Sequence, residues 1–216
     1  MKPLVVVNFK NYVSGKDALD LARKVEIYCG NAIVAVPFLD IKEIASQVNL
    51  PVYAQHIDYF EQGRSTGYIT PESLLNVGVA GSLLNHSEHK LSFTSIKKTI
   101  DRCNKLNLKL IVCASTLKDA QKIIGLKPYA IAFEDPKLIA TGNSIAKYDS
   151  SAVSSFAKML EGTNIIPLCG AGISSAEDVA KAVILGCKGV LVSSAVAHPS
   201  VPQEGEKFLK EISQLF

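Results

Sequence analysis

Residues 109–134 read KLIVCASTLKDAQKIIGLKPYAIAFE, and this stretch carries the pattern that decides the fold. It begins with an apolar, β-branched run at 109–114, continues with helical spacing of apolar residues at 116–124, and ends in a second apolar run at 129–134. Runs without polar alternation are typical of strands buried on both faces. Because parallel strands need a long crossover between them, this order predicts a parallel strand–helix–strand unit.

The same unit repeats along the whole chain. Short β-branched runs occupy 4–9, 33–38, 52–57, 81–86, 109–114, 129–134, 164–169 and 188–193, and segments with helical spacing follow at 17–28, 40–48, 70–78, 94–106, 116–124, 150–160, 174–185 and 205–216. Eight repeats favour an α/β fold closed into a (βα)8 TIM barrel, since the rival, an open doubly wound sheet, leaves two edges and usually has fewer strands. No shift in composition marks a linker, so we expect residues 1–216 to form a single barrel domain.

Composition excludes several classes of function. The net charge is +3 with basic and acidic residues interleaved, so no basic stripe indicates nucleic acid or a membrane surface as partner. No apolar run is long enough to span a bilayer, and the start MKPLVVVNFKNY lacks the features of a secretory signal. The 5 cysteines are scattered without a CxxC pair, as expected of reduced core thiols. We therefore expect a cytoplasmic protein.

Polar residues at the ends of the predicted strands are the first candidates for a site, because barrels place their sites at the carboxyl ends of the strands. The strand at 129–134 ends on Glu134, the strand at 81–86 runs into His86 and Glu88, and the first strand ends with Asn8 and Lys10. Because side chains alternate along a strand, Asn8 and Lys10 are predicted to face the same side, toward the barrel mouth. A lone Glu or Lys at a strand end is more often simply solvated, so only the whole set argues for chemistry.

Small residues after the last two strands predict a phosphate site. The segment CGAGISS at 169–175 joins a strand to a helix, and Ser193 and Ser194 follow the final strand. Barrels commonly bind phosphate on the backbone amides of these two connections. The string HSEH at 86–89 lacks an evident third ligand, so we expect no metal site.

A cation, an imidazole, a carboxylate and a phosphate cradle at one mouth suit proton abstraction next to a carbonyl in a small phosphorylated substrate. Glu134 would take the carbon-bound proton, and His86 and Lys10 would polarise the carbonyl. This chemistry requires no metal and no organic cofactor.

In these motifs the chain resembles the triosephosphate isomerase family, in particular its shorter archaeal form. The segments that carry the resemblance are NFK at 8–10, NHSE at 85–88, FEDPKLIATG at 133–142, CGAGIS at 169–174 and GVLVSS at 189–194. The family is itself the standard illustration of a Glu base, a neutral His electrophile and a closing loop, so these roles are carried over from it. The resemblance implies interconversion of dihydroxyacetone phosphate and glyceraldehyde 3-phosphate.

Carried over residue by residue, the resemblance makes Glu134 the base, His86 the electrophile and Lys10 the electrostatic partner. Asn8 would help to hold the substrate, and Glu88 would stand behind Lys10 as a supporting acid.

Phosphate contacts are likewise implied by the resemblance. They fall on backbone amides at Ile139 and Ala140, in the segment that corresponds to the family's lid, and at Gly172, Ser193 and Ser194. Ala140 stands where a lid glycine is common, and Ser193 and Ser194 replace two glycines of the family. The added side chains leave less room for a phosphate to approach the backbone.

The polar loop QGRSTGY at 62–68 resembles the family loop that carries a Thr into the neighbouring subunit's site, so Thr66 implies a homodimer or homotetramer. Two other functions stay open on the residues alone. One is a different phosphate-binding barrel, such as a sugar-phosphate epimerase or a lyase. The other is a barrel that binds a phosphorylated metabolite without catalysis.

Overall fold

Eight parallel strands close into a barrel in which each strand pairs with the next and β8 pairs with β1. The structure is a computed structural model that describes residues 3–138 and 144–215. The strands are β1 (Leu4–Asn8), β2 (Ile33–Val36), β3 (Val52–Ala54), β4 (Gly81–Leu84), β5 (Lys109–Ala114), β6 (Ala130–Phe133), β7 (Ile166–Cys169) and β8 (Gly189–Val192). The predicted (βα)8 barrel and its strands are confirmed.

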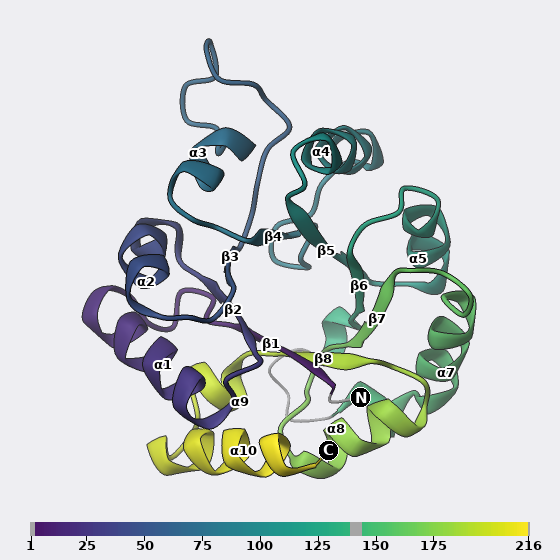
Figure 1. Cartoon of the computed structure of the whole chain (residues 1–216). Coiled ribbons are helices and arrows are strands. Elements are labelled where there is room, and N and C mark those ends of the chain that lie inside the picture. The colour runs from purple at the N-terminus through teal and green to yellow at the C-terminus, as the bar shows by residue number, and fades with distance from the viewer. Residues whose placement is uncertain (1–2, 139–143, 216) are drawn as a thin grey trace.

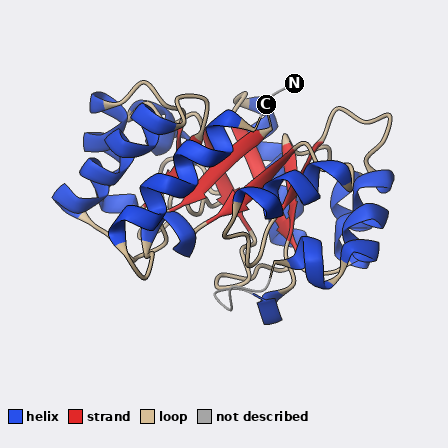
Figure 2. Ribbon diagram, turned by 90° about the horizontal axis from the view of Figure 1, so that it is seen from below, coloured by secondary structure: helices blue, strands red, loops and turns tan. Residues whose placement is uncertain are grey.

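Helices cover the barrel on its outside, as Figures 1 and 2 show. They are α1 (Gly15–Tyr28), α2 (Ile41–Gln47), α3 (Pro71–Asn76), α4 (Phe93–Lys105), α5 (Leu117–Ile124), α6 (Ile145–Tyr148), α7 (Ser150–Met159), α8 (Ala176–Ile184), α9 (Ser194–Ala197) and α10 (Pro202–Gln214), with short 3-10 turns η1 (Phe38–Asp40) and η2 (Pro136–Leu138). The short elements α6, α9, η1 and η2 were not predicted, because segments of three or four residues carry too little periodicity to recognise.

Several helices begin at capping residues that the sequence displays. The side chains of Thr70, Ser92 and Thr116 accept a hydrogen bond from the backbone N–H three residues on. Ser175 and Asp178 form a reciprocal capping box at the start of α8. These caps satisfy amide groups that the first turn of a helix leaves unpaired.

The barrel interior is a layer of inward-facing side chains, among them Val6, Tyr53, Leu83, Ile111 and Leu191. The ring of Tyr53 fills the space beside β4, where a Cβ on residue 81 would lie 2.5 Å from it, so only glycine fits there. The centre of the barrel is therefore filled by side chains.

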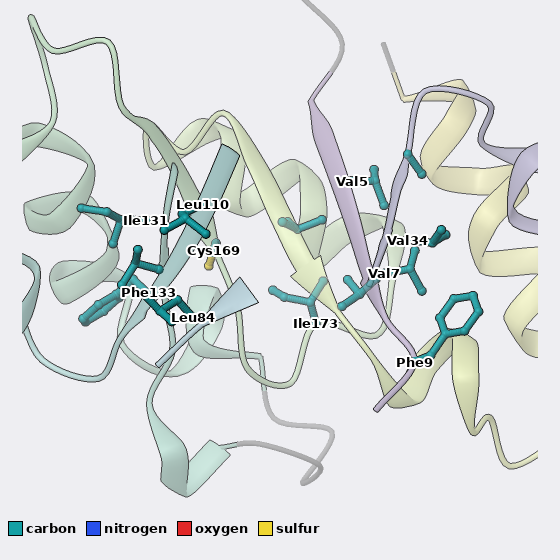
Figure 3. Close-up of a cluster of buried hydrophobic side chains, with 14 of the residues drawn as sticks. Val5, Val7, Phe9, Val34, Leu84, Leu110, Ile131, Phe133, Cys169 and Ile173 are labelled. Carbon is teal, nitrogen blue, oxygen red and sulfur yellow. The ribbon is translucent and has the colours of Figure 1, made fainter. Parts of the chain in front are cut away.

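Alternate strand residues face outward and pack under the helices. Figure 3 shows part of this second cluster, with Val5, Val7, Val34 and Ile131 on the outer faces of their strands. Phe133 on β6 stacks on Phe156 of α7, with ring centroids 5.1 Å apart. Among the described residues, no helix is long and apolar enough to cross a membrane.

Candidate active site

Strand alternation places two of the expected residues at the barrel mouth. Val6 faces inward on β1 and Asn8 follows two residues later, while Ala132 faces inward on β6 and Glu134 follows it. The N–H of Glu134 still donates to the carbonyl of Ala114 at 3.0 Å, so the β5–β6 ladder reaches the acid. Asn8 and Glu134 are buried, at 4% and 5% exposure, and both line one cavity.

Lys10 reaches the same cavity by a different route from the one predicted. The strand ends at Asn8, and Lys10 has a left-handed φ of 47°, so alternation does not extend to it. The Asn8 side chain accepts a hydrogen bond from the Lys10 N–H at 2.9 Å, and Gln55 donates to the Lys10 carbonyl at 2.8 Å. Lys10 Nζ lies 2.6 Å from Glu88 Oε1, which brings the expected cation and supporting acid together.

His86 faces Glu134 across the cavity, with its Nε2 3.7 Å from Glu134 Oε2. Its Nδ1 accepts a hydrogen bond from the backbone N–H of Glu88 at 3.2 Å. An imidazole whose Nδ1 accepts carries its proton on Nε2 when neutral. The side that faces Glu134 and the cavity is therefore a hydrogen-bond donor.

Glu134 has a buried oxygen, Oε2, without a hydrogen-bond partner in the described structure. Such an atom at a cavity wall can accept a hydrogen bond from a bound molecule, because leaving it unpaired costs free energy.

Two neighbours of Glu134 were not predicted as part of the site from the sequence. A Cβ on Gly170 would lie 2.5 Å from Glu134 Cγ, so the missing side chain at position 170 makes room for the acid. The thiol of Cys113 lies against the carboxyl group, and its pKa is raised well above the ordinary value by burial and then by Glu134. Cys113 lies on β5 and Gly170 directly follows β7, the two strands beside β6, and contacts between strands are not visible in one sequence.

Three of the expected phosphate-binding residues line the same cavity of about 40 Å³, namely Gly172, Ser193 and Ser194. The Ser193 hydroxyl is buried without a hydrogen-bond partner in the described structure. An adjoining cavity of about 370 Å³ shares Asn8, Lys10 and His86 with it. Ile139 and Ala140 lie outside the described residues.

Thr66 stands apart from this cavity, exposed on the β3–α3 connection that projects beyond the helices in Figure 1. Asp58 and Ile69 close the base of that loop with two hydrogen bonds of 2.9 Å. His89, the second histidine of the HSEH string, stacks on His56 with centroids 4.1 Å apart. Within the described residues, no three His, Cys, Asp or Glu side chains are grouped to hold a metal ion.

The assembled mouth brings together around one cavity an imidazole N–H, an ammonium group and a carboxylate oxygen that has no hydrogen-bond partner in the described part of the chain. A carboxylate accepts a proton, an N–H stabilises oxyanion character, and an ammonium offsets negative charge. The arrangement suits the transfer of a proton from carbon next to a carbonyl group.

Comparison with known proteins agrees with this chemistry. Residues 3–212 match the family model described as triosephosphate isomerase. A triosephosphate isomerase of Methanocaldococcus jannaschii is 38% identical over 209 residues, covering 93% of this chain and 95% of the relative. One from Sulfolobus acidocaldarius is 35% identical over 216 residues, covering 96% and 94%. The crystal structure of triosephosphate isomerase from Bartonella henselae, at 18% identity, superposes with a TM-score of 0.76 over 100% of this chain and 99% of that one, which shows the fold.

Proposed function

The chain belongs to the triosephosphate isomerase family and interconverts dihydroxyacetone phosphate and D-glyceraldehyde 3-phosphate, and we propose that Glu134, His86 and Lys10 catalyse the reaction. This isomerisation of an aldose to a ketose is a step of glycolysis and gluconeogenesis. We propose further that the whole chain acts as one domain and needs no cofactor.

Each group has one role in the proposed mechanism. Glu134 removes the proton from the hydroxyl-bearing carbon next to the carbonyl, the hydroxyl proton passes to the former carbonyl oxygen, and the carboxyl returns its own proton to the former carbonyl carbon. His86 donates the Nε2 hydrogen bond to the substrate oxygen while the enediolate forms. The observation that carries this assignment is the 3.7 Å separation, at one cavity wall, between His86 Nε2 and Glu134 Oε2, an oxygen that has no hydrogen-bond partner among the described residues.

Lys10 supplies the positive charge that attracts the phosphorylated substrate and offsets charge on its oxygen. Its partner Glu88 is 56% exposed at the side chain, so it can turn toward solvent when a substrate takes its place. Asn8 holds the Lys10 backbone and contributes to substrate binding.

Phosphate binding is proposed on the amides at Gly172, Ser193 and Ser194, with Ile139 and Ala140 added on the sequence alone. The position of these residues after β6, β7 and β8 supports the proposal, since parallel barrels bind phosphate at this end.

The first experiment is a coupled assay of the purified chain in both directions, with and without a chelator. Rapid interconversion of the two triose phosphates that a chelator leaves unchanged is expected. Turnover that needs added divalent metal, or that appears only with a larger sugar phosphate, would replace these roles with those of another phosphate-binding barrel.

We also propose that the chain is at least a homodimer through the loop around Thr66, as a dimer or a tetramer. The exposed apolar side chains of Phe38, Leu39 and Tyr68 support an interface, and Phe38 lines one cavity with Ile69, which follows Tyr68 in that loop. Thr66→Arg should yield monomers with low activity, and Ser155→Arg on α7 is the matched control. Light scattering that finds an active monomer in the parent protein would end this proposal.

A cytoplasmic location is the remaining part of the proposal. The five cysteines are buried and form no disulfide in the described chain, which suits a reducing compartment. Fractionation of cells that express the tagged chain tests it directly.

A further inference from the structure

Asn85 immediately precedes His86 and has an unusual backbone. It follows the last residue of β4, has a left-handed φ of 58°, and is only 6% exposed. Asparagine tolerates this region better than most residues because its short amide can bond locally. A buried residue with a left-handed backbone directly after a strand is uncommon, and its conformation needs a structural explanation.

Strand alternation identifies what the left-handed turn achieves. Leu83 faces the barrel interior and Leu84 faces the helices, so continued alternation would turn His86 outward. Instead His86 lines the cavity at the mouth. The change of backbone direction at Asn85 therefore redirects the imidazole toward Glu134.

The Asn85 side chain holds this turn from both sides. Its Nδ2 donates to the carbonyl of Cys113 at the end of β5, at 2.9 Å. Its Oδ1 accepts from the N–H of Leu91, at the far end of the turn that follows β4, also at 2.9 Å. One amide thus ties the strand beside Glu134 to the segment that carries His86 and Glu88.

The turn at 86–91, which the Asn85 side chain holds, determines the hydrogen bonds of His86. The N–H of His89 donates to the His86 carbonyl at 2.8 Å, and the N–H of Glu88 donates to His86 Nδ1 at 3.2 Å. Since the Glu88 amide selects the tautomer, any change in the course of this turn alters both the direction of the ring and the location of its proton.

We propose that Asn85 is a positioning residue, which holds the 86–91 turn so that His86 presents its Nε2–H to the substrate. The inference rests on the proposed role of His86 as the electrophile. If Asn85 merely stabilised the end of β4, its replacement would lower the stability of the protein and leave the turnover of the folded enzyme unchanged.

The test compares Asn85→Gly with Asn107→Gly in the full chain. Glycine adopts the left-handed backbone freely and removes both side-chain bonds. Asn107 is the matched control, since it has a φ of 56° and is exposed in the turn before β5, at the other end of the barrel. Because small displacements of a catalytic group are costly, kcat of Asn85→Gly should fall about 10- to 100-fold with KM close to the parent's.

Nitrogen NMR of histidine-labelled protein gives a second readout. The parent has 4 histidines, and the signals of His86 are those lost in His86→Gln. In the parent, Nδ1 of His86 should be the unprotonated nitrogen, and in Asn85→Gly the two tautomers should mix. Asn107→Gly should match the parent in kcat and spectrum.

Asn85→Asp keeps the acceptor for the Leu91 N–H and loses the donor to Cys113, so it covers the case in which Asn85→Gly does not fold. Parent-like kcat and tautomer in either folded variant would overturn the proposal, and so would a loss of activity that matches the unfolded fraction. If His86→Gln itself turns over like the parent, the proposed role of His86 as the electrophile fails, while the tautomer of His86 in Asn85→Gly still decides whether Asn85 positions the ring.

Discussion

Replacing Gly170 by alanine should slow the enzyme strongly, although no catalytic residue is itself replaced. The added Cβ would lie 2.5 Å from Glu134 Cγ and 2.9 Å from Oε1. Non-bonded carbon atoms prefer about 3.5–4.0 Å, so the glutamate must move by about 1 Å. Gly170 is not among the glycines with positive φ, so alanine is acceptable to the backbone and the effect is one of space.

The magnitude follows from that displacement. Misplacing a catalytic group by about 1 Å costs about 100-fold in rate, or about 2.7 kcal/mol of transition-state stabilisation. Overpacking should also lower the free energy of unfolding by about 1–3 kcal/mol, which leaves the barrel folded at room temperature. We therefore expect kcat/KM to fall about 100-fold in a protein that still unfolds cooperatively.

Steady-state isomerisation and thermal unfolding are measured together on Gly170→Ala and on Gly125→Ala. Gly125 is the control because a Cβ there meets only the Lys122 carbonyl, at an ordinary 3.7 Å. A folded Gly170→Ala variant with parent-like kcat/KM would refute the reasoning. It would mean that the carboxylate does not need the position it occupies here.

Three further predictions follow from the same structure. Glu134→Gln should keep fold and phosphate binding and lose about 10²–10⁴-fold in turnover as the general base is removed, and near-normal rates would take Glu134 out of that role. Lys10→Met should raise KM and lower kcat, both measured in the isomerisation assay, and parent-like constants would mean that the cation faces away from substrate. Burial alone would raise the pKa of Asp178, but its ion pair with Lys147 and its hydrogen bonds lower it overall. A lowered pKa stabilises the fold at neutral pH, so Asp178→Asn should cost about 1–2 kcal/mol there, and the difference should shrink as pH falls below the ordinary value of 3.8 in pH-dependent unfolding experiments.

The sequence by itself determined the barrel, because the pattern of apolar runs and helical spacing is local and repeats along the chain. It also located Asn8 and Glu134 at the mouth, since both continue the alternation of their strands. The helical segments predicted at 70–78, 94–106 and 116–124 begin within two residues of the caps Thr70, Ser92 and Thr116, and such caps are local because each bonds to an amide three residues away.

Only the tertiary structure decided how the remaining groups meet. Lys10 and Asn85 leave the strand conformation at left-handed residues, and a single sequence does not reveal the φ of an individual residue. Gly170 leaves space for Glu134, and Asn85 bonds to Cys113. Both contacts bridge neighbouring strand ends, whose spacing is set by closure of the barrel. Contacts of this kind depend on the side chains of distant residues packing together, so local periodicity carries no trace of them.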